Sequence, residues 1–519
     1  MQLVAYGAQD VYLTTNPQIT FWKVVYRRHT NFSMESIEQT FNGQADFGRR
    51  VQCTISRNGD LAYRTYLQVT LPQIDASMAR WLDYPGEQLI SEVEVEIGGQ
   101  RIDKQYGDWM HIWNQLTMTS EQERAYNAMV GQTTQLTYVT NPKYADVATA
   151  CSSTSAPASV CAPRKSLPET TLYVPLQFWF CRNPGLALPL IALQYHEVKI
   201  TLTLRPIDEC LWAAGSDSKK DSKAHSKSLV AASLYVDYIF LDTDERRRMA
   251  QNPHEYLIEQ LQFTGDESIG STSNKIKLNF NHPCKELVWV VQKDKVVDYC
   301  KHYESGDDIN TMKGAQPFNY TDGIDALPND LLAYSNDAAD GNDGSKFINT
   351  TNGLFKDTLA DEPQLTATTD ATQTSGAVGT VTITSGGAGV SDAGAFVLAE
   401  SALHMHCWGS NPVVTAKLQL NGQDRFSERE GSYFDTVQPF QHHTRAPDSG
   451  INLYSFALRP EEHQCSGTCN MSRIDNATLH LVVSHNAVNQ NDTAKVRVYA
   501  TNYNVLRIMS GMGGLAYSN

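Results

Sequence analysis

The sequence predicts an all-β protein made of two tandem eight-stranded jelly-roll β-sandwiches with a few short helices in loops. Three observations support this fold class. Apolar and polar residues alternate along most of the chain, and its 519 residues are too many for one hydrophobic core. The two halves also carry the same landmarks in the same order. Repetition on this scale indicates a duplicated domain, because solenoid repeats recur every ~20–50 residues.

Four pairs of landmarks define the repeat. Ile37-Glu38-Gln39 corresponds to Ile258-Glu259-Gln260, and an alternating run closed by a tight turn at 93–101 corresponds to 417–425. A Leu-Tyr pair at 172–173 corresponds to 453–454, and a tyrosine-bearing strand at 234–238 corresponds to 496–500. Because the order is kept while the spacing changes, we expect the copies to differ by loop insertions.

Strands are predicted wherever the alternation is regular, as at 51–55, 198–204 and 276–280. Such a period of two is typical of antiparallel sheets with one buried and one wet face. Asn421-Gly422 predicts a two-residue hairpin, since both central positions of a type I′ turn need positive φ. The sequence therefore favours short antiparallel strands joined by tight turns.

Helical signals are few. Residues 120–130 have a capping-box start and stop at Gly131, and a second short helix is predicted from Asp244 to Ala250. Near the end of the chain, Gly511-Met512-Gly513-Gly514 predicts a flexible tail.

The predicted modules occupy residues 33–242 and 257–519, joined by a linker with a short helix at 243–256. Residues from about 303 to 402 differ from their surroundings by their richness in Thr, Ala, Gly, Asp and Ser. We interpret them as a long surface insertion in the second module, because a buried loop would leave backbone groups unpaired.

The net charge of −15 argues against direct binding of nucleic acid, which requires a surplus of Lys and Arg. Basic clusters at 246–248 and 219–227 are short, so we interpret them as solvated surface. Apolar runs such as 186–193 are too short to span a bilayer. No secretory signal begins the chain, so we expect synthesis in the cytosol and ten cysteines that are mostly buried thiols.

The sequence predicts no catalytic, cofactor-binding or metal-binding residues and no cofactor. Candidate zinc ligands occur at 404–407, at His442-His443 and at 463–465 with Cys469, but they lack paired ligand spacing. No nucleophile elbow or phosphate loop is present. Glu92, Glu94 and Glu96 alternate with valines, so we expect them on one exposed strand face, with their repulsion relieved by a cation or a neighbouring Arg.

Six Asn-x-Ser/Thr sequons would carry glycans only if the chain entered a secretory route. They are Asn31, Asn319, Asn349, Asn470, Asn476 and Asn491, of which Asn319 and Asn349 fall in the predicted surface insertion. Large aromatic groups suit a core between packed sheets or a subunit interface. They include Phe178-Trp179-Phe180, Trp109, Trp113 and Trp289.

Several longer segments resemble the major capsid proteins of large nucleocytoplasmic double-stranded DNA viruses. In the N-terminal region these are VAYGAQDVYL at 4–13, NPQITF at 16–21 and YRRHTNF at 26–32. NPGLALPLIALQYH at 183–196 and SGTCNMSRIDNA at 466–477 resemble the same family in the two modules. The similarity runs through the whole chain apart from the predicted insertion.

The resemblance implies a double jelly roll that assembles as a homotrimeric, pseudo-hexagonal capsomer in an icosahedral virion. It also implies that residues 1–32 form an arm facing the capsid interior. The implied partners are the chain itself, neighbouring capsomers, minor capsid or cement and penton proteins, and an internal membrane layer through membrane proteins. Assembly in the host cytoplasm is expected, and enzymatic activity is not.

Two alternatives remain open at this point. A carbohydrate-binding or carbohydrate-hydrolysing β-sandwich would need a pair of cleft carboxylates or a glycan site. A minor capsid or penton-type protein would have a single jelly roll, which the repeated landmarks disfavour.

Overall fold

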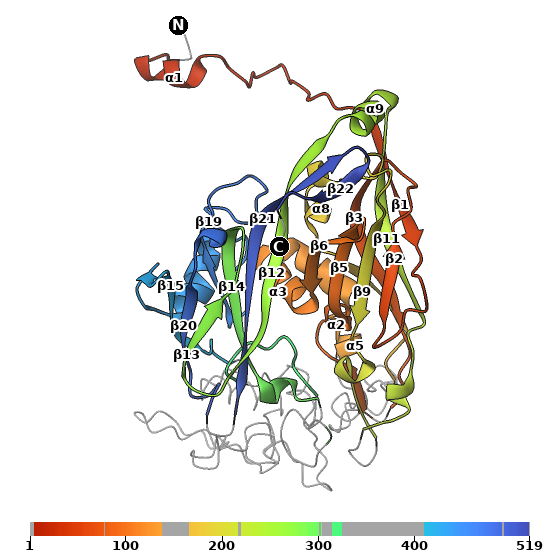
Figure 1. The fold of residues 1–519 in the computed structure, drawn as a ribbon, viewed down its shortest axis with the longest axis vertical. Coiled ribbons are helices and arrows are strands. Elements are labelled where there is room, and N and C mark those ends of the chain that lie inside the picture. Colours follow the sequence, from red (N-terminus) through yellow and green to blue (C-terminus); the bar gives the residue numbers. More distant parts are fainter. Residues whose placement is uncertain are drawn as a thin grey trace, which may run out of the picture.

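The computed structural model describes residues 5–76, 78–137, 166–215, 220–299, 303, 314–323, 409–489 and 492–517. Most of the predicted 303–402 insertion, including Asn349 and the candidate ligands at 404–407, lies outside them, as does Asn491. Two β-sandwiches stand side by side, with the N-terminal segment extending away from them near α9 (Thr243–Gln251) (Figure 1).

Eight strands make the two main sheets of the first module, which run in the orders β1-β11-β3-β7 and β2-β9-β5-β6. They are β1 (Phe32–Gln39), β2 (Arg50–Thr54), β3 (Leu61–Leu71), β5 (Ile90–Ile97), β6 (Gln100–Tyr106), β7 (Thr170–Pro175), β9 (Val198–Leu204) and β11 (Ala231–Leu241). The short strand β8 (Leu188–Pro189) pairs with β3, whereas β4 (Met78–Trp81) and β10 (Leu211–Ala214) form a separate two-stranded sheet.

The second module repeats this topology with the orders β12-β21-β14-β18 and β13-β20-β15-β16. Its main strands are β12 (His254–Ile269), β13 (Ser273–Leu278), β14 (Pro283–Lys293), β15 (Val413–Leu420), β16 (Gln423–Asp424), β18 (Ile451–Ser455), β20 (Ala477–Val483) and β21 (Ala494–Met509). Short strands β17 (Arg429–Glu430), β19 (Cys469–Asn470) and β22 (Met512–Leu515) complete it. The predicted tandem jelly rolls are therefore confirmed strand by strand.

Each pair of sequence landmarks falls on equivalent strands of the two modules: β1 and β12, the β5–β6 and β15–β16 hairpins, β7 and β18, and β11 and β21. Asn421 and Gly422 both have positive φ, as predicted, and so do Gly98 and Gly99 in the equivalent turn. The two Leu-Tyr pairs lie on equivalent strands, but their leucine side chains point to opposite faces of the sheet. Leu172 points into its module's core, whereas Leu453 points out toward the other module.

Helices connect and cover the sheets. They are α1 (Val11–Thr14), α2 (Pro85–Leu89), α3 (Gly107–Thr117), α4 (Ser120–Val130), α5 (Thr134–Thr137), α8 (Trp179–Arg182), α9, the π-helical turn η7 (Tyr433–Val437) and α14 (Gln438–His442). Short 3₁₀ turns lie at 8–10, 184–186, 207–209, 224–226, 294–297 and 471–473. The predicted helices at 120–130 and 244–250 are α4 and α9. Among the described residues, no helix is both long and apolar enough to span a bilayer.

Two predictions about loops are wrong. Gly511–Gly514 is not a free tail, because β22 turns back to pair with β21, and Gly513 exchanges polar contacts with the His196 ring. Residues 314–321 of the predicted surface insertion are largely buried, and Ala315 and Tyr320 belong to hydrophobic clusters. Burial of their apolar side chains is favourable. The buried polar side chain of Asn319 is satisfied by hydrogen bonds with its neighbours Gln316 and Thr321.

Each module has its own core, and a third cluster fills the space between them. Phe178, Trp179 and Phe180 lie in the first core, and Trp289 lies in the second. Trp109 and Trp113 lie in the cluster between modules. Cys53, Cys181, Cys210 and Cys284 are buried thiols as expected, while Cys465 is exposed.

Candidate functional site at the junction of the two modules

Helix α3 of the first module covers the outer face of the second module's β12-β21-β14-β18 sheet. Trp109, Ile112, Trp113 and Leu116 pack on Val288 and Val290 of β14, Leu453 of β18 and Tyr499 of β21. As a result β14 is buried on both faces, although antiparallel sheets commonly leave one face wet. The junction is thus a hydrophobic interface, which resists sliding of one module on the other.

A buried carboxyl on α3 anchors this interface. Asp108 accepts a hydrogen bond from Arg497 of β21 at 2.9 Å and one from Arg205 of the first module at 3.4 Å. Arg497 also donates to Asp266 and Gln292, each at 2.9 Å. Burial opposes its charge, but Asp108 and its neighbours outweigh burial and raise the pKa of Arg497. A charged pair so fully bonded fixes α3 in position on the second module.

A second charged cluster joins β12, β14 and the first module. The Glu259 carboxylate accepts from Lys285 at 2.8 Å and from Arg182 at 3.2 Å. The Arg182 guanidinium lies over the Trp113 ring at 4.0 Å from its centroid, a cation–π contact strengthened by desolvation. Arg182 therefore connects the first module's α8 to the second module while covering α3.

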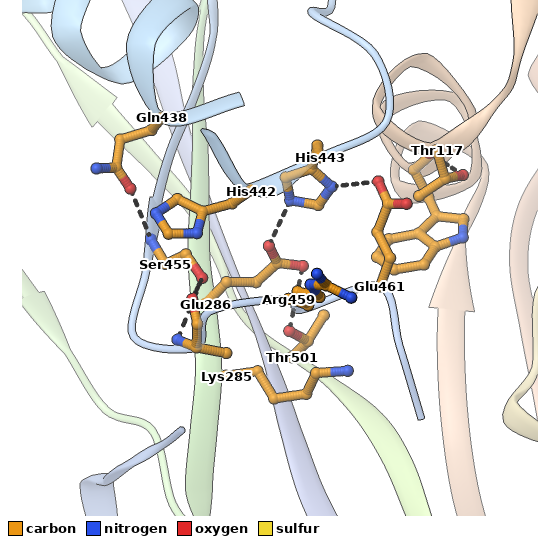
Figure 2. A network of polar contacts seen from close by, with 12 residues as sticks. Thr117, Lys285, Glu286, Gln438, His442, His443, Ser455, Arg459, Glu461 and Thr501 are labelled. Carbon is orange, nitrogen blue, oxygen red and sulfur yellow. Dashed lines mark hydrogen bonds and ion pairs between the residues drawn. The ribbon is translucent and has the colours of Figure 1, made fainter. Parts of the chain in front are cut away.

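A third buried ionic group lies in the second module beside α3. His443 follows α14, and its Nε2 and Nδ1 contact Glu286 at 2.7 Å and Glu461 at 2.8 Å (Figure 2). The side chains of His443 and Glu286 are fully buried. The Trp113 ring meets the His443 ring edge-on at 6.4 Å. Residues after His443 continue onto the first module, where the Arg445 N–H donates to the Leu116 carbonyl and its side chain pairs with Glu123.

The two carboxylates hold His443 in its charged form. Burial opposes the imidazolium, but Glu286 and Glu461 outweigh it and raise the pKa of His443 to about 9. Burial would raise the pKa of Glu286 as well, yet His443 and Lys285 lower it below its usual value. Glu461 also has a lowered pKa, because hydrogen bonds from His443 and Thr444 outweigh its burial. The group is therefore a carboxylate–imidazolium–carboxylate triad at neutral pH.

This triad predicts a stability maximum between about pH 4.5 and 6.5. From pH 6.5 to 9 the folded protein keeps a proton on His443 that the unfolded chain loses, so stability should fall by about 3 kcal/mol as pH rises. Below pH 4.5 the unfolded chain binds protons that Glu286 does not, so stability should fall as pH falls. Urea unfolding midpoints measured across pH check both limbs. If the alkaline limb persisted unchanged in His443→Ala, this assignment would be wrong.

A cavity of about 210 Å³ opens between β6 and β12, lined among others by Arg101, Lys104, Tyr106 and Phe263. The one carboxylate among its lining residues is Asp103, which accepts from the Leu261 and Lys104 N–H groups and from Gln105. Burial raises the pKa of Asp103 to about 7 despite these bonds. The cavity thus lacks the two carboxyls that glycoside hydrolysis requires.

The candidate residues identified from the sequence do not form a catalytic or metal site among the described residues. Among the described residues, neither His442-His443 nor 463–465 belongs to a group of His, Cys, Asp or Glu side chains that could hold a metal ion, and His443 is instead ion-paired with Glu286 and Glu461. Glu92 and Glu94 are relieved by cations, as predicted, with Lys104 near both and Arg50 2.9 Å from Glu94. Glu94 is, however, buried rather than exposed. Arg246–Arg248 lie exposed on α9.

The sequons differ sharply in exposure. Asn31, Asn470 and Asn476 are exposed, whereas Asn319 is buried and its side-chain amide donates to Gln316 and Gly323. Because Asn319 is buried, its predicted place on an exposed insertion is wrong. A glycan on this side chain would disrupt the surrounding packing.

Sequence reasoning missed Asp108, Arg497 and Glu286. Arg497 stands between the buried Val496 and Val498 on β21, and its own side chain is only 13% exposed. A charge in such a strand predicts a buried ion pair, but its partner lies 389 residues away in the chain.

Known proteins match the chain over nearly its whole length. Residues 20–242 match the family described as "Major capsid protein N-terminus", and residues 245–514 match "Large eukaryotic DNA virus major capsid protein". The two matches meet at the start of α9.

Relatives and a solved structure agree with the family match. The major capsid protein of Phaeocystis pouchetii virus is 70% identical, and that of Chrysochromulina ericina virus is 65% identical. Each alignment covers 100% of this chain and 99% of the relative. A chain from the quasi-atomic PBCV-1 virus capsid matches with a TM-score of 0.64 and 34% identity, covering 96% of this chain and 100% of that chain.

These relatives are capsid proteins and give no support to a carbohydrate-binding or carbohydrate-hydrolysing protein. The junction described above fits their role, because it joins two modules into one rigid building unit without presenting a catalytic constellation. The chain belongs to the family of large eukaryotic DNA virus major capsid proteins and is a structural component of the viral capsid, not an enzyme.

Proposed function

We propose that three copies of the chain form a pseudo-hexagonal capsomer and that these capsomers tile an icosahedral shell. The observation that carries the proposal is the shared strand order of the two modules. Three chains with two such modules each present six similar sides, so a three-fold object can pack on a hexagonal lattice. The buried junction supports this arrangement, because it keeps the two modules of each chain at one fixed angle.

The N-terminal arm is proposed to contact other components on the inner side of the shell. Its described residues, 5–31, are almost all exposed, including Phe21 at 99% and Trp22 at 87%. Large aromatic groups left in water gain free energy when a partner covers them. Minor capsid or cement proteins, penton proteins and membrane proteins of an internal membrane layer are the proposed partners. Assembly is proposed to occur in the host cytoplasm.

Native mass spectrometry of the purified protein tests the oligomeric state. We expect a complex of three chains of 57.7 kDa each. The trimer interface of such an obligate unit should bury ~2,000 Å² or more, so the complex should survive dilution and moderate salt. A protein that stays monomeric under these conditions would contradict the proposal.

A further inference from the structure

Equivalent sheet faces of the two modules differ in what covers them. In the second module the outer face of β12-β21-β14-β18 is buried under α3. In the first module the outer face of β1-β11-β3-β7 carries Tyr66, Tyr173 and Tyr235 and is partly open. Tyr173 is 39% exposed, and Tyr66 and Tyr235 are half-buried.

The three tyrosines form one aromatic surface across neighbouring strands. Tyr66 and Tyr235 are directly opposite in the ladder and stack at 5.4 Å, and Tyr173 lies 6.2 Å from Tyr66. Ser36 of β1 adds a hydrogen-bonding contact with the Tyr66 hydroxyl. Clustered tyrosines with exposed faces are typical of the centre of protein interfaces.

The second module contains its own counterpart of α3. In the first module α3 lies between β6 and β7, and in the second the η7–α14 segment lies between β16 and β18, the strands equivalent to β6 and β7. The η7–α14 segment runs beside β18, the last strand of its sheet, whereas α3 packs on β5 and β6 of its own module. The η7–α14 segment therefore shares with α3 its place along the chain between equivalent strands, and this shared place makes it the candidate to reach a neighbouring module.

This counterpart presents apolar side chains to solvent. Phe440 is 82% exposed and Val437 is 38% exposed, and their spacing of three residues places them on one side of the helical segment. Phe434 and Pro439 are buried within the second module. One side of the segment is thus held in its own module, while the other is left without a cover in the single chain.

We propose that the η7–α14 segment of one copy packs on the tyrosine surface of β1-β11-β3-β7 in the next copy. The contact repeats between chains what α3 makes within a chain, and it rests on the proposed trimer. Such a contact is heterologous, and rings form when a heterologous contact closes. In the resulting trimer, six modules form a ring. Three helix-on-sheet contacts within chains alternate around it with three such contacts between chains.

Two charged substitutions test the contact from its two sides. Phe440→Glu alters the η7–α14 segment and Tyr173→Glu alters the sheet, and each places a charge in the proposed interface. Native mass spectrometry should show single chains for both variants where the unmodified protein gives three. Val414→Glu is the matched control, because Val414 is 47% exposed on β15 of the other sheet and should remain trimeric.

Mixing the two variants tests the head-to-tail direction. Each variant keeps one intact side, so a Tyr173→Glu chain can offer its segment to the sheet of a Phe440→Glu chain. With one variant labelled by ¹⁵N and both at high concentration, we expect dimers containing one chain of each kind and no closed trimer. A mixture that stays entirely monomeric would contradict the contact.

The outcomes separate this inference from the proposed trimer. If the unmodified protein is not trimeric, the proposed function itself fails. If it is trimeric and both Glu variants remain trimeric, the inference is wrong and the trimer stands. Circular dichroism melting checks that each variant is folded. If a Glu variant fails to fold, Phe440→Ala or Tyr173→Ala replaces it in the same native mass measurement. These substitutions remove contact area without adding charge, so they should also reduce the amount of trimer.

Discussion

Replacing His443 by alanine should destabilise the second module by about 3–5 kcal/mol, because it leaves the buried Glu286 carboxylate without its principal counter-charge. Glu461 would lose its contact with the imidazole as well. Denaturant unfolding followed by tryptophan fluorescence measures the loss. Trp113, one of eight tryptophans, contacts the His443 ring, so part of the fluorescence change comes from the junction.

His442 provides the matched control for this experiment. It is the adjacent histidine, but its ring contacts the Leu458 carbonyl near the surface rather than a buried carboxylate. His442→Ala should change stability by less than about 1 kcal/mol, the usual range for a single exposed hydrogen bond. Equal losses in the two variants would show that the triad contributes nothing special to the junction.

Deleting residues 1–30 should leave a folded trimer that fails to build shells. The deletion ends before β1 begins at Phe32, and the described residues it removes are exposed apart from the partly covered Asp10. None of the described residues it removes has a buried side chain, so the melting temperature should stay unchanged. Electron microscopy of assembly reactions, or of particles from cells expressing the variant, measures the loss of shells.

A full-length variant separates the arm's contacts from its length. Phe21→Ser, Trp22→Ser and Tyr26→Ser together remove the exposed aromatic groups while keeping the chain intact. We expect this variant to reproduce the assembly defect, because apolar contact area is what a partner would cover. Normal shells from both the deletion and the triple variant would rule out the arm as an assembly contact.

The strands and their repetition could be predicted because their signals are local. Alternation at 198–204 and the Asn421-Gly422 turn need only neighbouring residues, and both match β9 and the β15–β16 hairpin. The sheet face to which each side chain points is harder to predict, because a shift of one residue in register reverses it. Leu172 and Leu453 illustrate this, because they occupy equivalent strands and opposite faces.

The junction could not be predicted because it depends on contacts between distant parts of the chain. Trp109 and Trp113 were identified as core or interface residues, but only the fold places them over β14. Asp108 and Arg497 are 389 residues apart, and Glu286 and His443 are 157 apart. Composition also misled for residues 314–321, where a polar, loop-like sequence folds into the molecule.

Cryo-electron microscopy of the purified protein tests most directly whether duplication yields a six-sided unit. We predict a three-fold ring of six jelly-roll modules in which each chain contributes two neighbours joined through α3. A ring with another number of chains, or modules of one chain that are not adjacent, would contradict the account.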